Sequence, residues 1–147
     1  MTSILVLNGP NLNLLGLREP DVYGHTTLPE IENAAMKHGA AHGVDVTCQQ
    51  SNHEGALVDA IHASVGKHSG VILNAGAYTH TSIALRDAIA GTGLAVVELH
   101  LSNIHARESF RHTSMIAPVA IGMICGFGAA GYTLAIDALV RHLGPHS

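Results

Sequence analysis

The residues of this sequence that could do chemistry gather in short polar segments, each of which follows an apolar run. These segments read NGPN at positions 8–11, NAG at 74–76 and ELH at 98–100, so they offer amides, a carboxylate and an imidazole. In open α/β sheets, ligands bind beyond the carboxyl ends of the strands. If the apolar runs are parallel strands, the three segments lie together and form a binding site.

Arginines add positive charge to the same regions. Three of the five arginines lie there, Arg18 in the first connection and Arg107 and Arg111 after the fourth apolar run. Arg107 and Arg111 are four residues apart, so they share one face if that stretch is helical. Because a guanidinium group can donate two parallel hydrogen bonds to a carboxylate, this concentration predicts an anionic small substrate. The alternative is that these arginines are solvated surface charges.

The first connection, residues 9–25, is longer than a usual strand-to-helix connection and carries Asn11, Arg18 and Tyr23. Long loops in compact domains are commonly lids or binding loops. Tyrosine, with a pKa of about 10, is a poor base at neutral pH, but neighbouring arginines favour the phenolate. Tyr23 is therefore a candidate base. From the residues alone, packing of its ring over apolar loop residues explains it equally well.

Five short apolar runs predict the strands that must position these side chains. They are typical of parallel strands that are buried on both faces. The runs are Ile4–Asn8, Val44–Cys48, Val71–Asn74, Leu94–His100 and Val119–Cys125.

Amphipathic segments between these runs predict helices. The first begins at Thr27, where Thr27 and Glu30 predict a capping box, and ends at Gly43. The others are expected over 54–67, 82–90 and 133–143. Strands that alternate with helices predict an α/β fold, because parallel strands need crossovers that cover the sheet. We expect a flavodoxin-like, doubly wound, five-stranded parallel sheet, with residues 1–147 as a single catalytic domain.

A glycine-rich stretch over 126–131, GFGAAG, has the context of a dinucleotide-binding fingerprint, since it follows a strand and opens a helix. It lies in the last strand–helix unit, however, and the acidic residue expected about 20 positions later would fall beyond residue 147. We therefore interpret these glycines as sites of close helix–sheet packing.

Twelve histidines raise the question of a metal site. His38 and His42 are four residues apart on the first predicted helix, and His100 and His105 are also near each other. A metal site would need a third ligand and a supporting shell, and no motif supplies them. Solvated helix histidines are the better interpretation, so we predict no metal ligands.

Composition narrows the class of partners and the setting. Charged residues make up 12% of the chain and the formal net charge is −4, so we expect no nucleic-acid partner. No apolar stretch is long enough to span a membrane and no signal peptide precedes the first strand, so we expect no membrane partner and a cytoplasmic location. Cys48 and Cys125 are expected to be reduced, buried thiols. Abundant small residues suggest contacts within an oligomer.

Several motifs together resemble those of type II 3-dehydroquinate dehydratases. The resemblance covers nearly the whole chain in order. Its motifs are NGPNLNLLG at 8–16, REP at 18–20, YG at 23–24, SNHEG at 51–55, NAGAYTHTS at 74–82, LRDA at 85–88, HLSNIHARE at 100–108 and FR at 110–111.

The resemblance implies a cofactor-free anti elimination of water from 3-dehydroquinate that gives 3-dehydroshikimate through an enolate. Tyr23 would be the base that removes a C2 proton, and Arg107 and Arg18 would hold it as phenolate. Asn11 would stabilise the enolate through a water molecule. His100 would protonate the departing C1 hydroxyl.

In the same family pattern, Glu98 would orient His100, and Asp87 would reach the site of a neighbouring subunit. The family forms dodecamers built from trimers, so the resemblance implies a homo-oligomer of that kind. Substrate contacts would come from Asn74, His80, Leu101, Ser102 and Arg111.

Two other functions remain open at this point. A flavodoxin-like binding or regulatory module would hold an anionic ligand without turning it over, and would need no base at Tyr23. A nucleotide-dependent α/β protein would use the loop over 126–131. The sequence does not distinguish aromatic biosynthesis from quinate breakdown, because both pathways use the same step.

Overall fold

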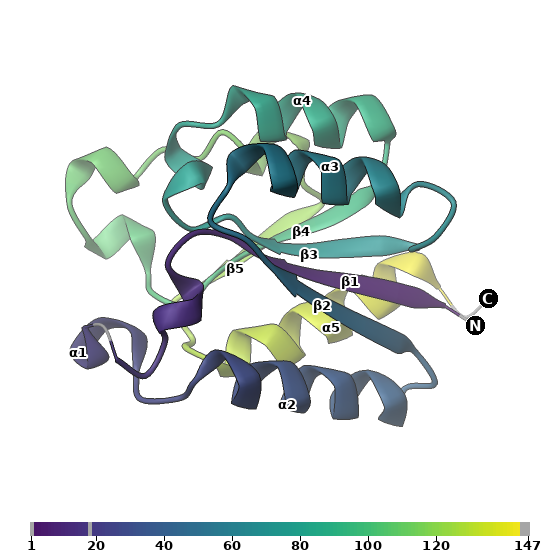
Figure 1. Ribbon diagram of the computed structural model, residues 1–147, viewed down its shortest axis with the longest axis horizontal. Coiled ribbons are helices and arrows are strands. Elements are labelled where there is room, and N and C mark those ends of the chain that lie inside the picture. Colours follow the sequence, from purple (N-terminus) through teal and green to yellow (C-terminus); the bar gives the residue numbers. More distant parts are fainter. Residues whose placement is uncertain (1, 18, 145–147) are drawn as a thin grey trace.

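The computed structural model describes residues 2–17 and 19–144, and at Tyr23 it describes the main chain. Five parallel strands form one sheet in the order β2-β1-β3-β4-β5, as Figure 1 shows. This order confirms the predicted flavodoxin-like topology. The strands are β1 (Ser3–Asn8), β2 (Asp45–Gln50), β3 (Gly70–Asn74), β4 (Ala95–His100) and β5 (Gly122–Cys125).

Helices cover both faces of the sheet, so the fold is a doubly wound α/β domain. α2 (Leu28–Ala41) and α5 (Ala130–Leu143) lie on one face, and α3 (Glu54–Ser64) and α4 (Ile83–Thr92) lie on the other (Figure 1). The four predicted helices are thus confirmed. Successive strands are added to one side of β1 and then to its other side, so the strand order reverses between β1 and β3. The carboxyl ends of these two strands therefore flank the crevice where such folds bind ligands.

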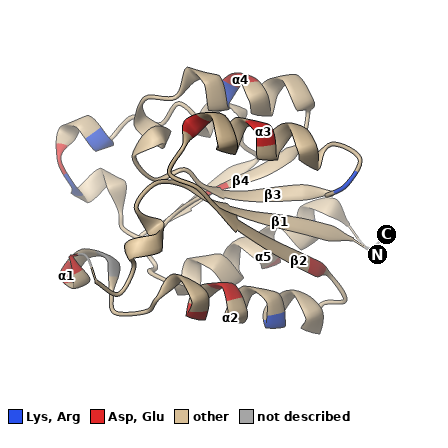
Figure 2. Ribbon diagram, viewed as in Figure 1, with Lys and Arg blue, Asp and Glu red and all other residues tan. Residues whose placement is uncertain are grey.

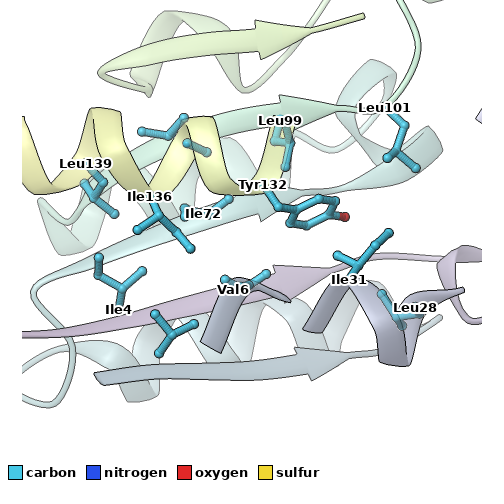
Figure 3. Close-up of a cluster of buried hydrophobic side chains, with 14 of the residues drawn as sticks. Ile4, Val6, Leu28, Ile31, Ile72, Leu99, Leu101, Tyr132, Ile136 and Leu139 are labelled. Carbon is cyan, nitrogen blue, oxygen red and sulfur yellow. The ribbon is translucent and has the colours of Figure 1, made fainter. Parts of the chain in front are cut away.

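Two apolar cores fill the spaces between the sheet and its helices. The core beneath α2 and α5 contains Ile4 and Val6 of β1, Leu99 of β4 and Ile136 of α5, all of them almost completely buried (Figure 3). Burying one such side chain contributes about 1.5–3 kcal/mol. The central strands β1 and β3 contribute apolar side chains to both cores, which holds their carboxyl ends in a fixed register.

The first turns of two helices are fixed by side-chain caps. The Thr27 hydroxyl accepts a hydrogen bond from the Glu30 N–H at 3.4 Å, so the predicted cap of α2 is confirmed. The capping box is incomplete, because the Glu30 carboxylate accepts from the Thr27 hydroxyl at 2.9 Å. Ser82 caps α4 by accepting from the Leu85 N–H at 2.9 Å.

Three sequence predictions about local structure were wrong in detail. The helix expected to reach Lys67 ends at Ser64, whose hydroxyl donates to the Ala60 carbonyl, and Gly66 then turns with a φ of 76°. The strand expected from Val119 begins only at Gly122, because Pro118 has no N–H for a ladder and lies in a 3-10 turn. Both cysteines are half-buried free thiols rather than fully buried ones.

In the glycine-rich stretch over 126–131, the predicted close packing of helix against sheet is found at Gly131. A Cβ at Gly131 would lie 2.8 Å from Leu99 Cδ1, so only glycine lets α5 begin this close to the sheet. Gly126 and Gly128 instead have positive φ angles, and their N–H groups donate to the carbonyls of His100 and Leu101 at 3.3 and 2.9 Å. These two N–H groups are already bonded and do not form a phosphate cradle.

No helix among the described residues is long and apolar enough to cross a membrane.

Candidate active site

A cavity of about 170 Å³ opens at the carboxyl edge of the sheet, where the segments after β1, β3 and β4 meet. Eight of the twelve side chains or backbone positions proposed from the sequence line it. They are Asn11, Asn74, His80, His100, Leu101, Ser102, Arg107 and Arg111.

The first connection positions Asn11 at the mouth of this cavity. It holds two short helices, η1 (Leu12–Leu14) and α1 (Pro20–Tyr23), so it is more ordered than a plain loop. Asn11 has a φ of 68°, in the left-handed region that few residues other than glycine adopt. Its N–H donates to Asn52 Oδ1 at 3.0 Å, which anchors the strained residue to the segment after β2.

His100 and Glu98 form a buried pair beside the cavity. Both lie on β4, and because they are two residues apart they point to the same face of the strand. His100 Nε2 lies 2.5 Å from Glu98 Oε2, and the Glu98 side chain is completely buried. With Nε2 donating to the carboxylate, Nδ1 is the ring nitrogen left to exchange a proton with a ligand.

Two hydroxyl groups hold Glu98 ionised from its other sides. Thr79 Oγ1 donates to Oε2 at 2.8 Å, and Ser114 Oγ lies 2.8 Å from both carboxylate oxygens. Burial alone would raise the pKa of Glu98, but hydrogen bonds from His100, Ser114 and Thr79, with the charge of His100, outweigh it and lower the pKa. Glu98 is therefore a fixed negative charge that orients the His100 ring through this hydrogen bond.

A tyrosine from α5 holds Asn74 in place. Asn74 Nδ2 donates to the Tyr132 hydroxyl at 3.0 Å, and that hydroxyl donates to Asn8 Oδ1 at 2.6 Å. Burial raises the pKa of Tyr132, so it stays a phenol. Asn74 Oδ1 accepts from the Gly76 N–H at 3.2 Å. The side-chain amide of Asn74 is therefore held in one orientation at the cavity wall, mainly by Tyr132 of α5.

His80 completes the imidazole side of the cavity. Its Nδ1 donates to the Thr113 carbonyl at 2.9 Å, which leaves Nε2 for a ligand. The rings of His80 and His100 are stacked, with centroids 6.4 Å apart. Two imidazoles from β4 and from the segment after β3 therefore share one wall.

Two arginines also line the cavity, and they lie in the segment after β4, which carries basic residues in Figure 2. Arg111 Nε donates to Glu108 Oε2 at 2.7 Å, and this bond lowers the pKa of Glu108. Arg107 Nη1 lies 3.4 Å from Ser102 Oγ. The segment that carries the two arginines is not a continuous helix, because it forms two separate turns, η3 (Ile104–Ala106) and η4 (Ser109–Arg111). Both still line the cavity.

Two described site residues, Glu98 and Asp87, do not line the cavity. Glu98 lies behind His100 and acts through it. Asp87 is exposed on α4 and does not line this cavity. Arg18 and the side chain of Tyr23 lie outside the described residues.

Sequence reasoning missed the residues that support the site from behind. Thr79, Ser114 and Tyr132 touch Glu98 or Asn74 and do not line the cavity themselves. A buried tyrosine needs a partner for its hydroxyl, so Tyr132 in an apolar helix face was the one detectable signal. Ser114 gave none, because it lies 16 residues from Glu98 in an irregular segment.

Comparisons with known proteins show the family of this chain. The family model described as "Dehydroquinase class II" matches residues 2–140. The chain belongs to the class II dehydroquinase family. Among similar proteins, 3-dehydroquinate dehydratase of Ruegeria pomeroyi is 70% identical over 145 residues, covering 99% of this chain and 97% of that protein. The corresponding protein of Nostoc sp. is 62% identical over 141 residues and covers 96% of each chain.

Solved structures of class II dehydroquinases have the same fold. The crystal structure of type II dehydroquinase from Butyrivibrio crossotus superposes with a TM-score of 0.92 at 44% identity, over 94% of this chain and 97% of that one. The corresponding enzyme from Propionibacterium acnes gives a TM-score of 0.91 at 40% identity, over 95% and 96%. The chain is therefore an enzyme of a hydro-lyase family, built on the flavodoxin-like fold.

Proposed function

We propose that this class II dehydroquinase removes water from 3-dehydroquinate to give 3-dehydroshikimate, without a cofactor. The observation that carries the proposal is the buried Glu98–His100 pair at the wall of a small cavity that arginines face. The pair supplies an oriented proton donor, and the arginines suit a carboxylate substrate. A cavity of about 170 Å³ suits a small ring-shaped metabolite.

In the first step, the Tyr23 phenolate takes a proton from C2, and the electrons of that C–H bond form an enolate on the adjacent ketone. In this proposal the cations of Arg18 and Arg107 hold Tyr23 as the phenolate, since nearby positive charge favours the charged form of a tyrosine. Asn11 stabilises the enolate oxygen through a water molecule, and a donor in this role commonly contributes a few kcal/mol. The constrained backbone of Asn11 supports this role because it fixes the direction of the side chain.

In the second step, the enolate collapses, the C1–oxygen bond breaks and a C1–C2 double bond forms. His100 donates a proton from Nδ1 to the departing hydroxyl, which leaves as water. Glu98 accepts the hydrogen bond from Nε2, which directs Nδ1 to the departing hydroxyl. The acid and the base come from different elements, which fits an elimination in which the proton and the hydroxyl leave from opposite faces.

The substrate is held by groups around the rest of the cavity. Asn74 and Ser102, with the backbone of Leu101, bind the carboxylate, while His80 and Arg111 bind ring hydroxyls. The fixed amide of Asn74 and the free Nε2 of His80 support these assignments.

Asp87 is proposed to act in a neighbouring subunit. Its exposure on α4, away from the cavity of its own chain, fits a dodecamer of trimers in which it reaches the next site. Residues 1–147 would form one catalytic domain in each subunit. The enzyme would serve the shikimate pathway or quinate breakdown in the cytoplasm.

The proposal is tested by measuring turnover and affinity on the same preparations. Chelator-treated wild-type protein incubated with 3-dehydroquinate should develop the absorbance of the conjugated enone. Tyr23→Phe should lose turnover, since it has no phenolate, yet keep its melting temperature and its affinity for the substrate. Tyr78→Phe, which alters another tyrosine near the site, is the matched control and should stay active. A Tyr23→Phe protein as active as the wild type would reject Tyr23 as the base.

A further inference from the structure

His38 of α2, His42 at the carboxyl end of this helix and Asp137 of α5 lie together where the two helices pack side by side. His38 and His42 are four residues apart, so they lie on one face of α2. His38 Nε2 lies 2.7 Å from Asp137 Oδ1, and His42 Nε2 lies 3.1 Å from the same oxygen. The sequence offered the histidine pair without a third ligand. The structure supplies one from a residue about 100 positions away.

The packing of α2 explains why these side chains meet. A Cβ at Gly39 would lie 2.3 Å from Val46 Cγ2, so glycine lets the helix lie directly on β2. Ala35 and Gly39 face the sheet and are buried. His38 and His42 therefore lie at the flank of α2, where α5 runs alongside on the same face of the sheet (Figure 1). The rings are edge to face, with centroids 4.9 Å apart.

The donor set and its spacing suit a divalent transition ion. Two imidazole nitrogens and a carboxylate oxygen are preferred ligands of Zn²⁺ and its neighbours, and a set of three leaves further positions for water. With metal–ligand bonds of about 2.0–2.1 Å, tetrahedral ligands lie about 3.3 Å apart. The three ligand atoms lie within 4.8 Å of one another, and the two nitrogen–oxygen distances are 2.7 and 3.1 Å. Small rotamer adjustments would bring them to bonding positions.

We propose that His38, His42 and Asp137 form a binding site for Zn²⁺ or a similar divalent transition ion, which ties α2 to α5. The ion would take the place of the hydrogen-bonding proton between His38 and Asp137. The three side chains are 31%, 40% and 43% exposed, so an ion can enter from solvent and keep water ligands.

The site is separate from the cavity described above. His42 follows the last residue of α2 and precedes β2, so it lies towards the amino ends of the strands. The cavity lies at their carboxyl ends. The ion would therefore stabilise the pairing of two helices, and elimination of water would not depend on it.

Calorimetric titration of the chelator-treated protein with Zn²⁺ tests the proposal, with thermal unfolding as a second readout. Wild-type protein should bind one ion per chain at this site, and its melting temperature should rise by about 5 °C at saturation. His42→Gln and Asp137→Asn should each weaken this binding about tenfold or more and remove the rise. His62→Gln, which changes an exposed histidine of α3, should match the wild type.

These variants alter half-exposed side chains, so they should fold, and the melting temperature without metal checks this directly. Asp137→Asn keeps the shape and a hydrogen-bonding oxygen while it removes the charge. If the wild type binds no Zn²⁺, or if Asp137→Asn and His42→Gln bind it as tightly as the wild type does, the proposal is wrong. In the second case the ion sits on other histidines, including His80 and His100 of the cavity.

Discussion

Ser114→Ala isolates the support behind His100, because Ser114 touches Glu98 and does not line the cavity. Its hydroxyl is one of three donors to a completely buried carboxylate. A hydrogen bond to a charged group contributes about 1.5–3 kcal/mol. The same oxygen accepts from the N–H groups of Ile116 and Ala117 at 3.1 and 3.0 Å, which the variant also leaves without this partner.

The expected loss of stability is about 2 kcal/mol, since water can reach the half-buried position and replace part of the lost bonds. For a domain of this size the melting temperature should fall by about 4–8 °C. Glu98 has a lowered pKa, so its contribution is present above its ordinary pKa and is lost as the pH falls through the lowered one. Ser114→Ala should reduce that lowering. The difference between variant and wild type should therefore be largest at neutral pH and should shrink in acid.

Catalysis should respond in kcat more than in KM. If the poorer orientation of His100 in the variant raises the activation free energy by about 1.4 kcal/mol, kcat falls about tenfold. The assay is enone formation under saturating and limiting 3-dehydroquinate, with thermal unfolding on the same samples. Ser114→Thr keeps the hydroxyl and should rescue kcat, and Ser109→Ala, at an exposed position, should match the wild type. An unchanged kcat in Ser114→Ala would refute the argument that Glu98 needs this hydroxyl to hold His100.

Three further predictions follow from packing and charge. Tyr132→Phe removes the hydroxyl that bridges Asn8 and Asn74, so thermal unfolding should show a loss of about 1–3 kcal/mol and steady-state kinetics a raised KM. Gly131→Ala places a methyl group 2.8 Å from a core leucine, so stability should fall by about 1–3 kcal/mol, measured by urea unfolding. Glu98→Gln should flatten the fall in melting temperature as the pH drops below 4.5, the ordinary pKa of a glutamate, because the stability contributed by the ionised wild-type carboxylate is lost as the pH falls through its lowered pKa.

The sheet and its helices could be predicted because each rests on a local pattern. Runs such as 71–74 are apolar on both faces, and Thr27 and Ser82 mark helix starts through their own hydroxyls. The ends were harder. Pro118 prevents β5 from beginning earlier, although the apolar run begins right after it. Gly66 lets the chain turn after α3, although apolar residues continue up to that position.

The cavity lining could be predicted because parallel strands bring their carboxyl ends together, which places Asn11, Asn74 and His100 in one crevice. The supporting contacts could not, because they join residues far apart in the sequence through irregular segments. Ser114 reaches Glu98 from a turn, and Asp137 reaches His38 across two helices. Such contacts depend on where elements pack, and no local pattern records that.

Turnover of 3-dehydroquinate by the wild type and by His100→Ala tests the central claim most directly. The claim is that water leaves from this cavity with His100 as the acid. Wild-type protein and His105→Ala, which alters an exposed histidine outside the cavity, should produce the enone at equal rates. His100→Ala should be slower by about 10²–10⁴-fold while it keeps its fold. Folded wild-type protein that makes no enone, or a His100→Ala protein as fast as the wild type, would contradict the claim.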